Sequence, residues 1–222
     1  MKNYIKELEM RFIKNSNPLY AAKMRKYMRD KFEYLGISSP LRKELTKDLL
    51  NTSNLPPLLE AREISTELWN KPEREYQYFA QEFLNKYSKQ YDAQFIDHFE
   101  YLITTKSWWD TADYISSNLV GSHFQNFPAL MIPTSRKWSL SDNMWLQRTS
   151  IIFQLKYKSK TNENILFEYI KHHTDSSEFF IRKAIGWALR EYSKTHPQEV
   201  IKFVNSNQLS GLSKREALKR IK

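Results

Sequence analysis

Three residues that could act on a charged substrate recur at a fixed spacing along the chain. The segment SWWDTADYISSNLVG (107–121) is followed 35 residues later by DNMWLQRTSIIFQLKY, and after another 35 by SEFFIRKAIGWALREY. In this register Asp113, Arg148 and Lys183 hold equivalent positions. Repeats of this length with helical patterning are typical of paired helices that stack into a solenoid, where equivalent positions line up along one surface. The spacing therefore predicts an acid, an arginine and a lysine in a row.

Two tryptophans share this predicted surface. In a helix over 178–193, Trp187 lies between the cations Lys183, Arg190 and Lys194, on the face opposite the apolar positions. Those apolar positions are Ile181, Ala184, Ile185, Ala188, Leu189 and Tyr192. A tryptophan among cations on a face outside the core is hard to explain as packing.

In the first repeat, Trp109 and Asp113 are four residues apart and share a helical face. The buried face of that helix is predicted to contain Trp108, Ala112, Ile115 and Leu119. Trp108, Trp138 and Trp145 are interpreted as core residues, because an aromatic side chain is more often core than site.

A carboxylate beside indole rings suits a reaction that passes through a cation. The carboxylate of Asp113 could stabilise a developing oxocarbenium ion or position water. The faces of Trp109 and Trp187 would attract a cationic base or an electron-poor sugar. On the residues alone, a surface aspartate paired with Arg148 or with a lysine is the more common explanation of Asp113.

The elements that must position these residues are predicted to be short helices. They are expected over 1–14, 20–35, 38–50, 57–70, 73–87, 91–104, 107–120, 127–138, 142–157, 162–173, 177–193, 197–205 and 213–221. Gly36 is a plausible glycine just after a helix end, and Ser38-Ser39-Pro40 a plausible helix start. No linker or strand alternation separates the helices, so an all-α, single helical-repeat domain is expected over 1–222.

Composition excludes several functional classes. The chain of 222 residues has no cysteine and only four glycines, so thiolate chemistry, disulfides and glycine-rich phosphate loops are not expected. His172 and His173 are adjacent and the other histidines are isolated, so neither a metal nor another cofactor is expected. The charged start of the sequence and the lack of a long apolar run favour a cytoplasmic protein without a membrane span.

The positive charge is concentrated in the later part of the chain. Residues 132–222 contain 17 Lys and Arg against 8 Asp and Glu, whereas residues 1–131 contain 18 against 17. This asymmetry favours a polyanion held by the C-terminal repeats, although a basic protein kept soluble by its charge remains the alternative.

Several segments resemble DNA alkylation repair glycosylases of the AlkD type. They are SWWDTADY, NMWLQRTSIIFQLKYK, FFIRKAIGWALREYSKTHP and LSKREALKRIK, with KFEYLGISSPLRKEL and ELWNKPEREYQY nearer the start. The resemblance implies a HEAT-like solenoid with a concave, positively charged DNA-binding face. It implies a monofunctional enzyme, expected to be a monomer, that removes cationic N3- and N7-alkylpurines from duplex DNA without a metal or a lyase step.

The resemblance also implies roles for individual residues. Asp113, Trp109, Trp187 and Arg148 match the family's catalytic set, with Arg148 gripping a phosphate. Tyr27 matches an aromatic residue near the opposite strand. Ser38-Ser39 departs from the family, whose members have a longer polar side chain at the first position. This departure affects the expected contacts to the opposite strand and not the chemistry. Further phosphate contacts are expected at Lys156, Lys158, Lys160, Lys183, Arg190, Lys214 and Arg215.

Two other functions are consistent with the same residues. A helical-repeat module could bind nucleic acid without chemistry and keep the basic C-terminal part unchanged. A helical scaffold could instead bind an acidic protein. Base release from alkylated duplex separates the enzyme from the binding module, and tight competition by duplex DNA would argue against the scaffold.

Overall fold

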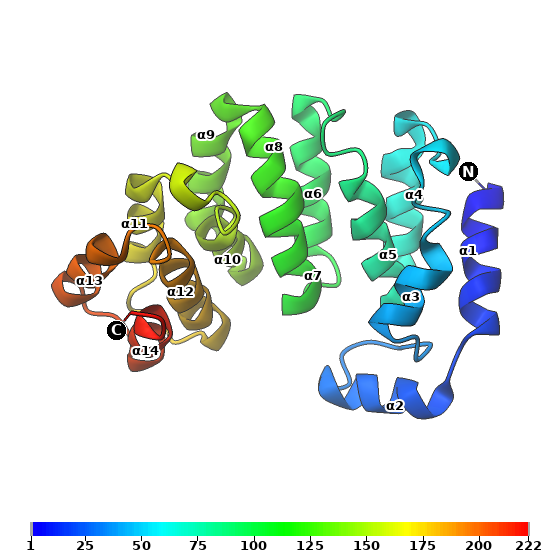
Figure 1. Cartoon of the computed structure of the whole chain (residues 1–222), viewed down its shortest axis with the longest axis horizontal. Coiled ribbons are helices and arrows are strands. Elements are labelled where there is room, and N and C mark those ends of the chain that lie inside the picture. Colours follow the sequence, from blue (N-terminus) through cyan, green and yellow to red (C-terminus); the bar gives the residue numbers. More distant parts are fainter. Residues whose placement is uncertain (1, 222) are drawn as a thin grey trace. The chain divides into compact units, whose positions relative to one another are not determined.

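The chain is all-helical in the computed structural model, which describes residues 2–221 (Figure 1). Within that range no strand forms, and the sole β feature is an isolated parallel bridge between Glu33 and Glu73. The all-α prediction is confirmed. The HEAT-like repeat type, the concave basic face and a single domain over 1–222 stay predictions.

The helices group into two compact units, Met1–Tyr91 and Asp92–Lys222. Unit 1 contains α1 (Lys2–Lys14), α2 (Pro18–Tyr27), α3 (Ser39–Thr46), η1 (Thr52–Asn54), α4 (Leu58–Asn70) and α5 (Arg74–Asn85). Unit 2 contains η2 (Ala93–Phe95), α6 (Ile96–Thr104), α7 (Trp109–Tyr114), η3 (Ile115–Val120), α8 (Gly121–Asn126), α9 (Pro128–Ser139), α10 (Met144–Ile152), η4 (Lys158–Lys160), α11 (Glu163–Lys171), α12 (Phe179–Tyr192), α13 (Pro197–Ser206) and α14 (Gly211–Leu218).

Unit 1 corrects the predicted helix over 20–35. The helix α2 ends at Tyr27, and Arg29 and Asp30 follow with positive φ angles of 57° and 54°. Gly36 does not cap a helix. Its φ is 84°, and a Cβ there would lie 2.0 Å from the backbone oxygen of Asn17, so only glycine fits. The predicted start of the next helix is confirmed, since the Ser38 hydroxyl accepts from the backbone N–H of Leu41 at the beginning of α3.

The segment between α2 and α3 is held by the start of α5. The fully buried carboxylate of Glu75 accepts hydrogen bonds from the backbone N–H groups of Leu35, Gly36 and Ile37. The neighbouring Arg74 stacks its guanidinium 3.9 Å from the ring centre of Phe32. These tertiary contacts override the helical pattern of residues 28–35.

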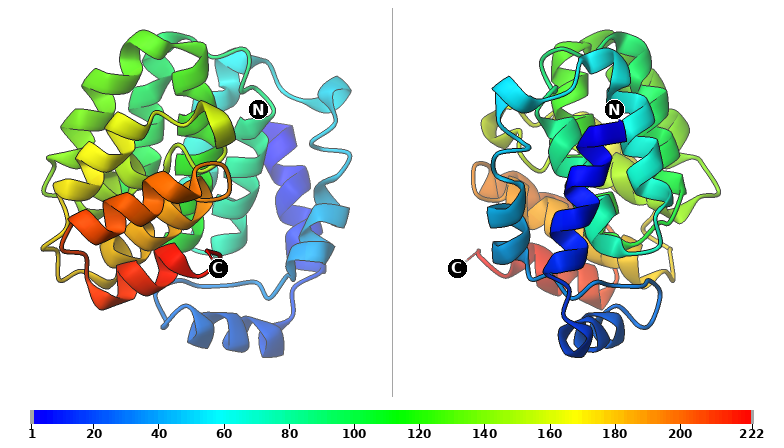
Figure 2. Two further views of the ribbon diagram at one scale, coloured as in Figure 1. Left: turned by 60° about the vertical axis from the view of Figure 1, so that its left-hand side comes forward. Right: turned by 90° about the vertical axis from the view of Figure 1, so that its right-hand side faces the viewer.

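Unit 2 is built from helices packed against their neighbours in succession. The helix α10 packs on α9 and α12, and α12 packs on α14, which lies beside it in the orange-to-red part of Figure 2. The predicted apolar stripe of α12 is confirmed, because all six of its members are buried. They form one hydrophobic cluster with residues such as Ile151 and Phe203. The helix α10 ends at Ile152, five residues before the predicted end.

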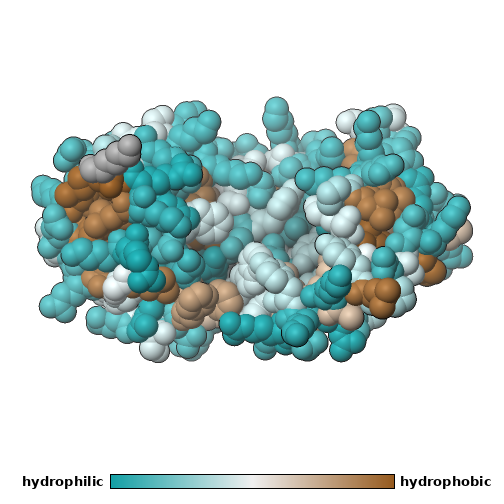
Figure 3. Space-filling model, turned by 60° about the horizontal axis from the view of Figure 1, so that its bottom comes forward, coloured by the Kyte–Doolittle hydropathy of each residue, from teal (hydrophilic) through white to brown (hydrophobic). Residues whose placement is uncertain are grey.

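The outer surface is mainly hydrophilic on the face drawn in Figure 3, with separate patches of apolar side chains. In the described part of the chain, no helix combines the length and the apolar character needed to cross a bilayer.

Candidate functional site

The helix that carries Trp109 and Asp113 begins directly after a tight connection from α6. Lys106 has a positive φ of 50°, and the Ser107 hydroxyl donates to the carbonyl of Ile103 at 2.6 Å. Trp108 is extended and is the residue before the first turn of α7; its carbonyl accepts from the N–H of Ala112. Trp109 and Asp113 are thereby set one turn apart on α7.

A π-helical turn follows Asp113. The helix α7 continues through η3 into α8 without leaving helical backbone angles, so the helix predicted over 107–120 instead extends to Asn126. The Ser117 hydroxyl donates to the Asp113 carbonyl at 2.8 Å, and Ser116 bonds to Thr149 on α10. Single π turns inside α-helices are frequent at functional sites.

Asp113 and Arg148 form a bidentate ion pair between α7 and α10. Arg148 Nε lies 2.7 Å from Asp113 Oδ1, and Nη2 lies 2.8 Å from Oδ2. The Arg148 side chain is 5% exposed and that of Asp113 is 16% exposed. Paired, planar hydrogen bonds of this kind fix the orientation of the carboxylate. The adjacency that the 35-residue spacing predicts is confirmed for these two positions.

Arg148 is held from its other side by α12. Its Nη1 donates to the backbone carbonyl of Phe180. The Phe180 ring in turn contacts the rings of Trp108 and Trp145, with centre-to-centre distances of 5.1 and 5.2 Å. Trp145 is buried as predicted, but Trp108 is only half-buried, so its assignment to the core is wrong. It belongs to an aromatic cluster with Trp145 and Phe180, and the backbone carbonyl of Phe180 binds Arg148.

The electrostatic environment of Asp113 contains opposing influences. Burial raises the pKa of the Asp113 carboxyl, and the charge of Asp110 raises it further, while the hydrogen bonds and charge of Arg148 oppose the shift. The pKa lies above the ordinary value of 3.8. A carboxylate that is partly desolvated and held rigidly is well suited to interact with a positive charge, because fewer water dipoles compete for it.

Trp109 and Trp187 are both half-buried, so part of each indole remains accessible. Trp187 lies on α12 with Lys183 one turn before it and Arg190 about one turn after it. These cations are not free, because Glu216 on α14 pairs with both of them. Lys194, the third predicted cation, pairs with Glu191 at 2.6 Å.

The sequence interpretation missed Glu216. A signal was present, because Glu216 is the lone acid in the basic segment 211–222. Among the three positions of the 35-residue register, Lys183 therefore differs: its partner is an acid from outside the repeat, whereas Asp113 and Arg148 bind one another.

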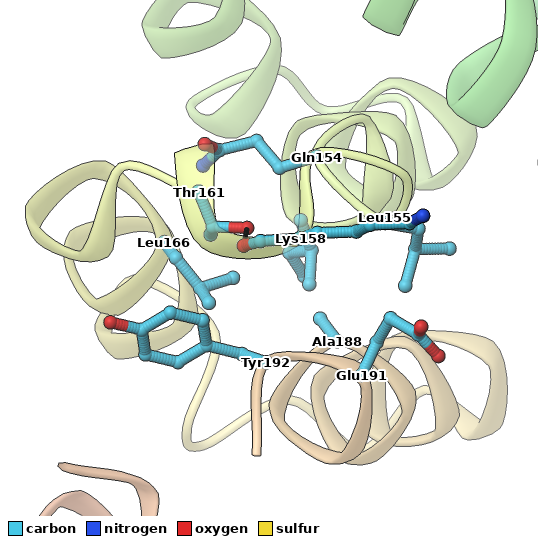
Figure 4. A pocket seen from close by; sticks show the side chains of 9 residues that line it. Gln154, Leu155, Lys158, Thr161, Leu166, Ala188, Glu191 and Tyr192 are labelled. Carbon is cyan, nitrogen blue, oxygen red and sulfur yellow. Dashed lines mark hydrogen bonds between the residues drawn. The ribbon is translucent and has the colours of Figure 1, made fainter. Parts of the chain in front are cut away.

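The remaining predicted phosphate contacts of unit 2 are exposed. Lys156 donates to the side-chain oxygen of Asn118, and Lys158 and Lys160 lie on the short turn η4. Lys158 also lines a small pocket (Figure 4). One side of the pocket is the segment that follows α10, and another side is α12. The hydroxyl of Thr161 donates to the Lys158 carbonyl there, at 2.8 Å.

Lys214 and Arg215 are exposed on α14 and make no ion pair within residues 2–221. In unit 1, Tyr27 is 73% exposed at the end of α2, and the Ser38 hydroxyl is used to cap α3. The exposed cations Lys156, Lys158, Lys160, Lys214 and Arg215, together with Tyr27, remain predicted DNA contacts.

No group of three or more His, Asp or Glu side chains in residues 2–221 is arranged to hold a metal ion. The groups that could act on a substrate are the carboxylate of Asp113, the guanidinium of Arg148 and the two indoles.

Comparisons with known proteins identify the family of the chain. The family of DNA alkylation repair enzymes matches the chain over residues 8–221. A solved structure described as a "predicted DNA alkylation repair enzyme" from Enterococcus faecalis is similar, with a TM-score of 0.87 and 34% sequence identity over 93% of this chain and 96% of that one. No match was found among the curated proteins. The chain belongs to the DNA alkylation repair enzyme family.

Proposed function

We propose that this member of the DNA alkylation repair family is a monofunctional DNA glycosylase. It hydrolyses the N-glycosidic bond of cationic N3- and N7-alkylated purines, such as 3-methyladenine and 7-methylguanine, in duplex DNA. The proposal rests on the Asp113 carboxylate. Asp113 lies on α7 together with Trp109, and Arg148 from α10 holds its carboxylate by two hydrogen bonds.

The proposed reaction needs little beyond a fixed negative charge. Alkylation at N3 or N7 makes the purine cationic, so the base leaves as a neutral molecule without an acid to protonate it. The bond between sugar and base breaks as positive charge develops on the sugar, and water then adds to the sugar carbon and loses a proton to the solvent. Asp113 stabilises that developing charge and attracts the water.

The ion pair with Arg148 leaves Asp113 capacity for this role. An ionised carboxylate has about four acceptor positions, and the two hydrogen bonds from Arg148 use one on each oxygen. The part of the carboxylate that remains exposed can face the sugar. The main role of Arg148 is to orient Asp113. The phosphate contact that the sequence suggests for Arg148 would use those of its N–H groups that do not bind Asp113 or Phe180.

Trp109 and Trp187 complete the proposed catalytic set. Both residues are half-buried. The accessible parts of their indoles would contact the lesion nucleotide, with a cation–π attraction of about 0.5–2 kcal/mol for a well-placed ring face. The exposed cations Lys158, Lys160, Lys214 and Arg215 would bind DNA phosphates and make binding depend on salt.

The test is base release by the purified protein in the presence of EDTA. A methylated DNA duplex is incubated with the protein, and free 7-methylguanine is quantified above the spontaneous background. We expect release, with strands that remain intact until alkali is added, because no lyase step is proposed. A lack of release under conditions where the protein binds the duplex would refute the proposal.

A second candidate is a nucleic-acid-binding module without chemistry. It is favoured by one observation, that both oxygens of Asp113 already accept hydrogen bonds from Arg148. In that case the ion pair would be structural, and salt-sensitive duplex binding would occur without base release.

A further inference from the structure

The carboxylate of Glu216 lies between the two cations that flank Trp187. It reaches from α14 to Lys183 Nζ at 3.2 Å and also pairs with the Arg190 guanidinium. Lys183, Trp187 and Arg190 share one face of α12, since they are spaced four and then three residues apart. One acid from another helix thus partly neutralises the charged surroundings of the indole.

Close packing between α12 and α14 fixes the backbone that carries Glu216. A Cβ on Gly186 would lie 2.5 Å from the Cβ of Glu216 and 3.0 Å from the carbonyl oxygen of Ser213, so no side chain separates the helices there. The Ser213 hydroxyl also donates to the carbonyl of Arg182 at 2.9 Å. The backbone position of Glu216 is therefore set by the packing of α14 against α12.

The charge on Glu216 is maintained at neutral pH. Its pKa is lowered, first by the hydrogen bond from Lys183 and also by that from Arg190. With Glu216 ionised, the three side chains have a net charge of one positive unit instead of two. An additional unit of positive charge several ångströms from Trp187 would repel a cationic guest.

We propose that Glu216 is a specificity-determining residue, which keeps the Trp187 face compatible with a positively charged alkylpurine by offsetting one of the two positive charges of Lys183 and Arg190. The inference rests on the proposed glycosylase function and deepens it. Lys183 and Arg190 then act chiefly as partners of Glu216, rather than as the phosphate contacts suggested by the sequence.

A matched control exists on the same helix. Glu191 on α12 pairs with Lys194, and it lines the small pocket drawn in Figure 4. Glu191→Gln and Glu216→Gln change the net charge of the protein by the same amount. Glu216→Gln unpairs the two cations about one turn from Trp187, whereas Glu191→Gln unpairs only Lys194, about two turns from it.

The experiment compares binding of two duplexes that differ in the charge of one base. One carries 7-methylguanine on a 2′-fluorinated sugar, which resists cleavage and keeps the base cationic. The other carries the neutral 7-deaza analogue with the same methyl group and sugar. We expect Glu216→Gln to reduce the preference for the cationic duplex by about three- to tenfold, the size expected from one extra unit charge near a solvated surface.

A charge rescue separates this role from a structural one. The double variant K183Q/E216Q restores a single positive unit on the Trp187 face, and it should restore the preference of the wild-type protein. Glu191→Gln should leave that preference unchanged. Circular dichroism verifies that each variant is folded.

The proposal is overturned if Glu216→Gln keeps the wild-type preference, if Glu191→Gln lowers it equally, or if the double variant is not rescued. These outcomes differ from failure of the proposed function, in which the wild-type protein would not release 7-methylguanine at all.

Discussion

Glu75 in unit 1 and Asp113 in unit 2 are acids with mostly buried side chains, but their oxygens face different partners. Glu75 is fully buried and accepts three backbone N–H groups, at 2.9–3.1 Å. Asp113 is bound by the guanidinium of Arg148, and 16% of its side chain is exposed. The three backbone amides enclose Glu75, whereas part of the Asp113 side chain remains exposed beside its partner Arg148.

The difference shows how the surroundings of a carboxylate decide its use. The charge of Glu75 shapes the chain between α2 and α3, because it satisfies three consecutive amides that would otherwise be buried without partners. Asp113 is oriented by the side chain of Arg148, and part of its own side chain is exposed where a substrate could reach it. Glu75 should therefore matter for folding and Asp113 for chemistry.

The largest effect on stability is expected for Glu75→Gln. The amide would retain an acceptor for Gly36 and Ile37 but would direct its NH₂ group at the N–H of Leu35, which is also a donor. We expect a loss of about 2–3 kcal/mol in the free energy of unfolding, measured by urea denaturation. Base release by the folded protein should change little.

The control for this prediction is Glu67→Gln, which removes one charge from an exposed position of α4. It should alter the free energy of unfolding by less than about 0.5 kcal/mol. Equal effects at Glu67 and Glu75 would show that the three amide contacts are not what makes Glu75 important.

A smaller effect is expected when the pH is lowered, namely a slower base release as Asp113 becomes protonated. The ionised form is the active one, so base release should fall as pH is lowered through a pKa that lies above the ordinary 3.8. Asp110→Asn should move this fall to lower pH, because the charge of Asp110 contributes to raising that pKa. Rates are corrected for spontaneous depurination at each pH.

The fall in rate would not reflect unfolding caused by Asp113. Its pKa is raised in the folded state, so its protonation favours the folded protein, and its contribution to stability decreases as pH rises through the folded pKa. A fall in rate centred at or below 3.8 would contradict the desolvated environment assigned to Asp113.

The smallest effects concern the cations of unit 2. Lys214→Ala and Arg215→Ala should each reduce the slope of log binding constant against log salt by about 1, with a several-fold loss of duplex affinity. Lys183→Ala should reduce the slope by less than half as much, because Glu216 already pairs with Lys183. Equal slopes for all three variants would mean that the pair opens when DNA binds.

Periodicity predicted the contact at the centre of the candidate site. The 35-residue register placed Asp113 opposite Arg148, and the apolar stripe identified the buried face of α12. Both features arise from regular helices, in which the spacing along the sequence determines which side chains share a face.

Features that depend on tertiary contacts were missed. Residues 28–35 have a helical pattern, but Glu75 and the close approach of Gly36 to Asn17 impose another path. Glu216 comes from outside the register, so its pairing with Lys183 could not be read from the spacing. Trp108 was assigned to the core because aromatic side chains are more often buried, and its contacts with Trp145 and Phe180, from two other segments, could not be inferred from the sequence.

The central claim is tested most directly by comparing Asp113→Asn with Asp110→Asn in single-turnover release of 7-methylguanine at neutral pH. Both substitutions remove one carboxylate from α7, but only Asp113 is bound by Arg148. We predict that Asp113→Asn lowers the rate by at least about 100-fold while duplex binding persists, and that Asp110→Asn stays within about threefold of the wild type. Release by a folded Asp113→Asn protein at the wild-type rate would contradict the assignment of the reaction to this carboxylate.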